Sequence, residues 1–144
     1  MSNKIIPLIG PRFPDRVIPL VERAKKSIDI LVYDWRWYPD DIGASIQIFN
    51  QTILKKAKQG VRVRAILNNN QTGCILQNNN CEARIKNFKN LLHAKLMLID
   101  DNISILGSHN YTKNAFERNL EVSIIIFNEK LNKIYREYFE NIWP

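Results

Sequence analysis

The chain of 144 residues lacks long hydrophobic runs, and it contains only two cysteines and two histidines. Its first apolar stretch, within MSNKIIPLIGPRFP, covers five residues and is interrupted by Pro7. A signal peptide needs a longer apolar core, and a membrane-spanning helix needs about 20 mostly apolar residues. We therefore expect a cytoplasmic protein without stable membrane insertion, provided that no leader was removed.

Metal-binding patterns are also scarce. Cys74 and Cys81 are separated by six residues and have no histidine or further cysteine nearby, unlike the ligands of a structural zinc site. The adjacent acidic pairs at 40–41 and 100–101 would diverge on a strand, so neither offers the converging carboxylates of a two-metal site. We expect no metal and no cofactor. The cysteines are expected to be free thiols, and a disulfide within the loop is the less favoured alternative.

Acidic residues are outnumbered, 14 to 21, which gives a net charge of +7. Such an excess favours polyanions, either nucleic acid or an anionic membrane surface. Arg62 and Arg64 share one face of an expected strand that leads toward the expected site, which makes them candidates for phosphate binding. Trp35, Trp37 and Tyr38 are candidates for base stacking or for insertion into a bilayer interface, although packing in the core or a dimer interface is favoured.

Helical and strand patterns alternate along the chain. The Asn-rich stretch 68–80 is expected to be an exposed loop or insertion, and no linker or internal repeat divides the chain. The alternation predicts one α/β domain, 1–144, with a largely parallel or mixed β-sheet flanked by helices. The expected helices are 14–26, 42–59 and 129–143, and the expected strands outside the central hairpin are 27–33, 61–67 and 120–127.

A β-hairpin is predicted in the middle of the second half. Residues 91–99 and 103–106 are short apolar runs that flank the turn-forming sequence Asp-Asp-Asn. If 101–102 form a two-residue loop, the strands place Asn110 opposite His93 and Ser108 opposite Lys95. One face would then gather an imidazole, an ammonium, an amide and a hydroxyl. This arrangement depends on the loop length, because a slip of one residue moves side chains to the other face.

The same segment carries a motif, His93-x-Lys95-x4-Asp100-x6-Gly107-Ser108-x-Asn110, that occurs once. It resembles the HxK(x)4D(x)6GSxN signature of the phospholipase D superfamily at every fixed position and spacing. The resemblance implies a mixed sheet flanked by helices and cleavage of a phosphodiester through a histidine nucleophile. It also assigns Asp100 and Ser108 to the catalytic set.

The resemblance implies a role for each polar group. His93 would attack phosphorus to give a phosphohistidine, while Lys95 and Asn110 hold the non-bridging oxygens. Glu121 corresponds to an acid that related small nucleases place against the nucleophilic histidine, where it would fix the tautomer. The alternative is that Glu121 is a solvated residue at the start of a strand.

A second protonated group must donate to the leaving oxygen. His109 occupies a variable position of the signature and faces away from His93 in the expected register. We therefore expect the acid to be His93 of a second subunit, since the resemblance implies that a chain with one signature forms an obligate homodimer.

These observations predict a metal-independent phosphodiesterase, in first place an endonuclease that acts on DNA or RNA with little sequence preference. Phospholipase D or cardiolipin hydrolase activity is the alternative within the same chemistry, although the chain lacks an amphipathic membrane helix and long apolar loops. A nucleic-acid-binding module without turnover is a further alternative, against which the intact His93, Lys95 and Asn110 argue.

Overall fold

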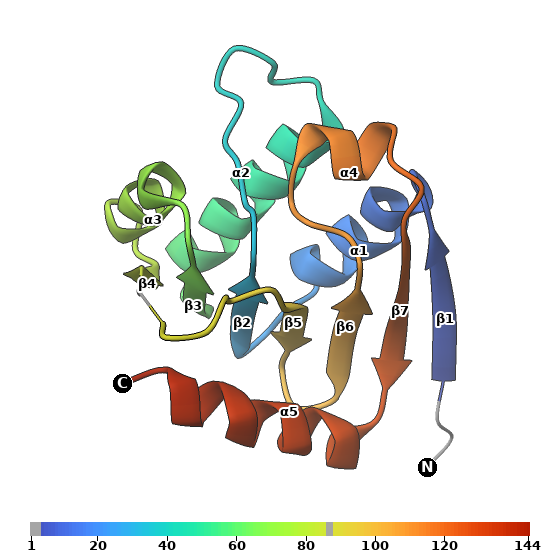
Figure 1. Cartoon of the computed structure of the whole chain (residues 1–144), viewed down its shortest axis with the longest axis vertical. Helices are drawn as coiled ribbons and strands as arrows, with labels where there is room; N and C mark the ends of the chain where they lie inside the picture. The colour runs from blue at the N-terminus through green and yellow to red at the C-terminus, as the bar shows by residue number, and fades with distance from the viewer. Residues whose placement is uncertain (1–3, 86–87) are drawn as a thin grey trace.

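The computed structural model describes residues 4–85 and 88–144. These residues form one seven-stranded sheet with the strand order β1-β7-β6-β5-β2-β3-β4, together with flanking helices (Figure 1). The elements are β1 (Lys4–Ile9), α1 (Arg12–Glu22), β2 (Ser27–Val32), α2 (Ser45–Lys58), β3 (Arg62–Leu67), α3 (Asn70–Gln77), β4 (Glu82–Ile85), β5 (Lys95–Ile99), β6 (Ile103–Gly107), α4 (Lys113–Glu117), β7 (Val122–Phe127) and α5 (Glu129–Ile142).

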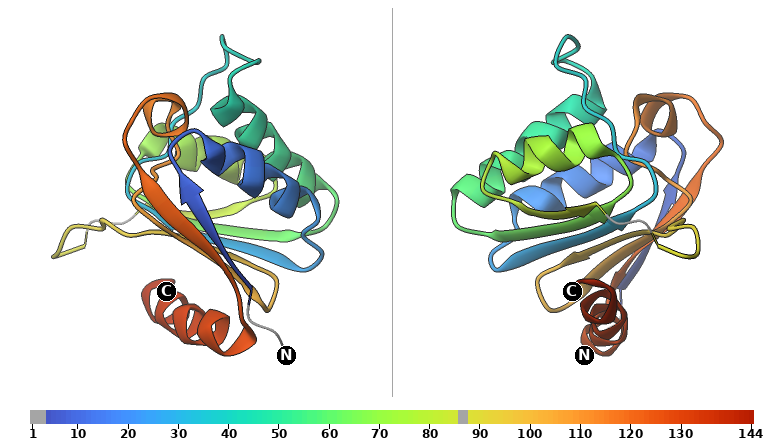
Figure 2. Two further views of the ribbon diagram at one scale, coloured as in Figure 1. Left: turned by 90° about the vertical axis from the view of Figure 1, so that its right-hand side faces the viewer. Right: turned by 60° about the vertical axis from the view of Figure 1, so that its left-hand side comes forward.

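Strand direction and helix placement confirm the expected fold class. The pairs β2–β3 and β3–β4 are parallel, whereas β2–β5, β5–β6, β6–β7 and β7–β1 are antiparallel, so the sheet is mixed. Helices α1, α2 and α3 cover one face of the sheet, and α5 lies against the other (Figure 2). Residues 28–32 of β2 are all buried, as expected for a central strand covered on both faces.

Two hydrophobic clusters hold these layers together. The larger one lies between the sheet and α1, α2 and α4, and it includes Phe13, Phe49 and Phe116. The smaller one joins the opposite face of the sheet to α5 through Phe139, which packs with Leu31 and Leu98. Burial of this apolar surface is the main stabilising contribution to the fold.

Most expected elements are present with shifted ends, but the expectation for 68–80 is wrong. Helix α3 occupies residues 70–77 of this stretch. The Asn69 side chain caps it by accepting a hydrogen bond from the Thr72 backbone N–H, and Thr72 and Leu76 are buried. Strands β1 and β4 were not expected from the sequence.

The hairpin forms in a register one residue from the expected one. Ile99 pairs with Ile103, so the loop has three residues, and its first residue, Asp100, adopts φ +52° in the left-handed region. The Asp100 carboxylate accepts hydrogen bonds from the backbone N–H groups of Lys25, Lys26 and Ser27, which draw it out of the strand. The expected pairs His93–Asn110 and Lys95–Ser108 are therefore wrong.

Candidate active site

The signature residues other than Asp100 lie at one end of the sheet, where several neighbouring strands begin or end. Lys95 starts β5 and lies opposite Val32, the last residue of β2. His93 precedes β5, Ser108 follows the end of β6, and Glu121 precedes β7. Because β5, β6 and β7 are antiparallel neighbours, these residues come to the same end of the sheet, although they do not pair directly with one another (Figure 1).

His93 and Lys95 form the centre of the site. The Lys95 Nζ atom lies 3.2 Å from Nδ1 and 3.3 Å from Nε2 of His93. The ring of Tyr33, the residue that follows β2, lies 5.0 Å from the His93 ring and 5.6 Å from Lys95 Nζ. Burial lowers the pKa of Lys95, and the negative charge of Glu121 only partly offsets this effect. A half-buried cation of this kind favours an anion as its ligand.

Asn110 is held by the segment that follows β2. Its Oδ1 atom accepts a hydrogen bond of 3.1 Å from the Asp34 backbone N–H. The neighbouring Tyr111 N–H donates to the Asp34 carbonyl, and the Arg36 N–H donates to the Tyr111 carbonyl, each at 2.9 Å. Because the amide oxygen is already engaged, the Nδ2 group of Asn110 is the end of the side chain that can donate to a phosphate oxygen.

Ser108 and Glu121 form a hydrogen-bonded pair. Ser108 Oγ donates to Glu121 Oε1 at 2.6 Å and accepts from the Val122 N–H at 3.0 Å. The other carboxylate oxygen of Glu121 accepts from Asn119 Nδ2 at 3.1 Å. Within residues 4–85 and 88–144, no hydrogen bond joins Glu121 to His93, so the contact expected between them is not formed in the single chain. Glu121 is nevertheless a structured, half-buried side chain and not a freely solvated one.

The side chain of His109 is packed in the interior of the protein. It is 1% exposed, its ring nitrogens lie 2.7 Å from Ser123 Oγ and 2.9 Å from the Gly10 carbonyl, and its ring stacks on Phe13 at 4.4 Å. Burial lowers the pKa of His109, against the raising effects of the Gly10 hydrogen bond and the Glu121 charge. A buried, neutral imidazole with both nitrogens engaged is poorly suited to donate a proton to a leaving group.

Comparison with protein families matches residues 17–143 to the family described as "Cardiolipin synthase, PLD-like domain". The chain belongs to the phospholipase D superfamily. The mitochondrial cardiolipin hydrolases of Canis lupus familiaris and Homo sapiens are 27% and 26% identical over 135 residues, which cover 89% of the chain. A phospholipase D of Rickettsia prowazekii is 26% identical over 125 residues, 83% of the chain and 57% of that relative. The chain spans about half the length of the cardiolipin hydrolases, 49% and 50%.

Solved structures of the superfamily share the fold over nearly the whole chain. NucT from Helicobacter pylori superimposes with a TM-score of 0.83 at 23% identity, covering 98% of this chain and 96% of NucT. The phospholipase D family member Nuc from Salmonella typhimurium superimposes with a TM-score of 0.82 at 21% identity, covering 99% and 95% of the two chains. The mixed sheet with flanking helices is therefore the phospholipase D fold.

One residue of the phospholipase D signature lies away from the others. Asp100 ends β5 at the turn, whereas Lys95 begins the same strand, so the two are separated by roughly 16 Å along the strand. With its carboxylate bound to backbone N–H groups of the loop before β2, Asp100 shapes the hairpin turn. Its assignment to the catalytic set is corrected to a structural role.

Arg62 and Arg64 are also placed away from the signature residues. Arg62 begins β3 opposite Ser27, at the end of the sheet remote from Lys95, and pairs with Glu82 at 2.8 Å. Arg64 is buried, with bonds of 2.8 and 3.0 Å to Asp29 and a further bond to Glu140. Strand β3 does run toward the end of the sheet at which Lys95 lies, but both arginines lie in its first half and pair there with acidic side chains, so the expected contact with the site is not formed.

The remaining expectations concern packing, cysteines and metals. Trp35 is buried and donates to Asn50 Oδ1 at 2.7 Å, while Trp37 and Tyr38 pack against the core, as favoured.

Cys74 and Cys81 are free thiols, and burial raises the pKa of Cys81 to about 11. In the described part of the chain, no cluster of three or more His, Cys, Asp or Glu suits a metal ion. None of the described helices has the length and apolar character required to cross a membrane.

Proposed function

We propose that this phospholipase D-family phosphodiesterase cleaves nucleic acid without a metal ion, with His93 as nucleophile. The close approach of Lys95 to His93 is the observation that carries the proposal. The imidazole would attack phosphorus, forming a P–N bond as the P–O bond to the leaving group breaks. Lys95 and the Asn110 amide would stabilise the charge on the non-bridging oxygens. Water would then hydrolyse the phosphohistidine and restore the free imidazole.

The leaving oxygen needs a proton, and a second copy of His93 would supply it. His109 is unsuitable because it is buried and hydrogen-bonded. Exposed apolar side chains lie beside Glu121, where Val122 pairs with Ile9 and Leu120 is fully exposed. Such a patch at the edge of the site supports its burial by a partner chain. The proposed active unit is a homodimer with two His93 side chains in one site.

A groove next to His93 supports a nucleic-acid substrate. Its volume is about 350 Å³, and its walls include Phe88, Leu91 and Tyr138, with Lys89 at its border. Aromatic walls beside a cation suit a nucleobase attached to the phosphate under attack. The net charge of +7 also favours a polyanionic substrate.

Hydrolysis of phospholipid is the second candidate. Two of the compared relatives carry the name mitochondrial cardiolipin hydrolase, and the exposed Leu91 gives the groove an apolar wall that suits an acyl chain. The chemistry at His93 would be the same, so only the substrate separates the two candidates.

The test incubates wild-type protein and His93→Ala with plasmid DNA, single-stranded RNA and cardiolipin vesicles in EDTA. We expect wild type to cut nucleic acid, and we expect His93→Ala to lose at least ~10³-fold in rate while its circular dichroism stays unchanged. Lys130→Ala, at an exposed position on α5, is the control and should keep full activity.

Three other outcomes of this test would each contradict the proposal. Activity that disappears in EDTA and returns with Mg²⁺ would refute the histidine mechanism. Cleavage of vesicles alone would establish the second candidate. Salt-sensitive binding of nucleic acid without any cleavage would reduce the protein to a binding module.

A further inference from the structure

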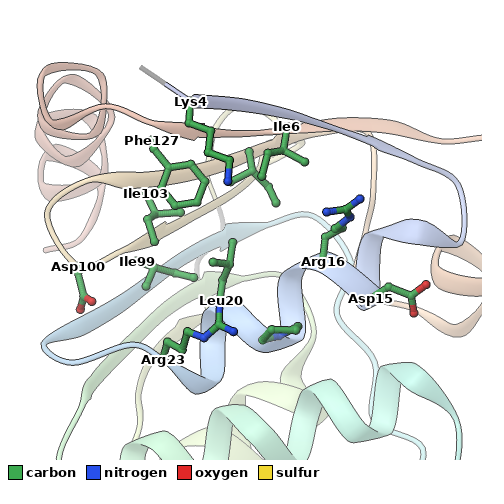
Figure 3. Close-up of a pocket in the computed structure, with 12 residues that line it drawn as sticks. Lys4, Ile6, Asp15, Arg16, Leu20, Arg23, Ile99, Asp100, Ile103 and Phe127 are labelled. Atoms are coloured by element: carbon green, nitrogen blue, oxygen red, sulfur yellow. The ribbon is translucent and has the colours of Figure 1, made fainter. Parts of the chain in front are cut away.

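A second cavity lies at the end of the sheet remote from His93. It has a volume of about 540 Å³ and opens between α1 and the strands β1, β7, β6 and β5 (Figure 3). This volume is within the range of small-molecule sites. The cavity adjoins the β5–β6 turn at Asp100, whereas His93 and Lys95 lie at the other end of β5, so the two regions are distinct.

The floor of this cavity is apolar and follows from strand register. Lys4, Phe127, Ile103 and Ile99 are opposed in one row across β1, β7, β6 and β5, so their side chains share the face toward α1. Ile6 and Ile125 extend this floor, and Pro19 and Leu20 of α1 form an apolar wall opposite it. Phe127 and Ile103 are only partly buried, so the floor remains accessible to a ligand.

Three cations line the opening above this floor. Lys4 extends from β1 with its Nζ atom 5.8 Å from the Phe127 ring, and Arg16 and Arg23 extend from α1 (Figure 3). Arg16 lies on α1 and Arg23 caps its C-terminal end; because they are seven residues apart, they lie on the same side of the helix about two turns apart. Among the described residues, neither arginine forms an ion pair, unlike Arg12, Arg36, Arg62, Arg64 and Arg136.

The two acids that also line the cavity do not neutralise these cations. Asp15 pairs with Arg12 at 3.5 Å and points away from the cavity in Figure 3. The carboxylate of Asp100 accepts backbone hydrogen bonds from Lys25, Lys26 and Ser27. The opening therefore has an excess of positive charge directly beside an apolar surface.

We propose that this cavity binds an amphipathic anion, an alkyl chain that ends in a phosphate or carboxylate. The head group would lie between Lys4, Arg16 and Arg23, since guanidinium groups bind both anions through paired N–H donors. The chain would cover the isoleucine and phenylalanine floor, which offers no hydrogen-bonding group to select a polar body. A single-chain phospholipid and a fatty acid both have this chemistry.

The experiment titrates decyl phosphate into the full chain by calorimetry, below the concentration at which it forms micelles. We expect saturable binding of one molecule per chain and a rise in melting temperature. Inorganic phosphate and the neutral detergent decyl maltoside should each bind at least about tenfold more weakly, because each lacks one half of the ligand. Decanoate in place of decyl phosphate distinguishes the carboxylate from the phosphate head group.

Matched variants locate the binding. Arg16→Gln combined with Arg23→Gln should weaken decyl phosphate at least about tenfold, because the charge-assisted bonds are lost. Arg118→Gln, an exposed arginine outside the cavity, and His93→Ala at the separate site should leave the affinity unchanged. Equal weakening by Arg118→Gln, or no saturable binding to wild type, would overturn the proposal. Lys4 would then act as an inward-pointing charge that protects an edge strand from association.

Discussion

The half-buried ammonium of Lys95 gives the site a pH dependence of its own. Because its pKa is lowered, Lys95 loses its charge at a lower pH than an exposed lysine, whose pKa is about 10.4. The value of kcat/KM should therefore fall on the alkaline side before about pH 10.4. Lys95→Arg should shift this fall to higher pH, although its absolute activity is lower. The measurement is kcat/KM against pH for both proteins, and an identical alkaline limb would exclude Lys95 as its origin.

His109 is expected to affect stability and not chemistry. His109→Ala removes two hydrogen bonds and the stacking partner of Phe13, which should lower the free energy of unfolding by about 2–4 kcal/mol. Turnover per folded molecule should remain close to wild type. Urea denaturation combined with an activity assay at low temperature separates the two effects. Loss of turnover in a fully folded His109→Ala protein would make His109 the general acid.

At the scale of elements, Arg64 connects α5 to the sheet. Its guanidinium bonds Asp29 on β2 and Glu140 on α5, and Arg136 on α5 also bonds Asp29. Arg64→Ala leaves a buried carboxylate without this partner and should cost about 3–5 kcal/mol of unfolding free energy. The exposed pair of Arg62 with Glu82 is the matched control, and Arg62→Ala should cost at most about 1 kcal/mol. Denaturant melts of both variants check this difference.

The contact between β6 and β7 depends on Gly107. A Cβ atom at this position would overlap the backbone and side chain of Ser123, which also holds His109. Gly107→Ala should therefore destabilise the protein by about 2 kcal/mol or more. Gly43→Ala, where a Cβ atom meets nothing within 4 Å, should be neutral or slightly stabilising. Equal melting temperatures of the two variants would contradict the proposed overlap.

Sequence patterns predicted those elements whose own residues show a clear apolar spacing. The strand over 27–33 and the helix over 129–143 match β2 and α5 closely, because apolar spacing alone defines them. The hairpin register was missed because Asp100 is drawn out of β5 by amides of Lys25 and Lys26, far away in sequence. Strand β1 was missed because it forms only by pairing with β7.

For the candidate site too, the sequence predicted residues of a local motif but not contacts with distant parts of the chain. The motif spacing predicts His93, Lys95 and Asn110 as site residues, and their catalytic role stays a prediction; the structure places His93 beside Lys95 and binds Asn110 to the segment that follows β2. The sequence did not indicate Tyr33 as a neighbour of His93, because the residues around Tyr33 carry no sign that β2 pairs with β5. Arg64 was misassigned because its partners, Asp29 and Glu140, come from distant parts of the chain.

At the scale of the whole molecule, the proposed homodimer with two His93 side chains in one site predicts a non-linear response to subunit mixing. A heterodimer of one wild-type and one His93→Ala chain would have one histidine for two roles and should be nearly inactive. Activity in mixed, re-equilibrated populations should then follow the square of the wild-type fraction. Linear dependence on that fraction, or full activity of a monomer in sedimentation, would show that each chain works alone.

The pairing of β1 with β7 has a consequence for folding during synthesis. Strand β1 lies at the edge of the sheet, and its partner strand β7 emerges from the ribosome only after all the other strands of the described sheet. Until then, the apolar segment KIIPLI has no neighbour with which to complete its backbone hydrogen bonds. Pro7 removes one N–H from this segment, which disfavours pairing with strands of other nascent chains. The proline that interrupts the first apolar stretch thus protects the strand that must wait longest for its partner.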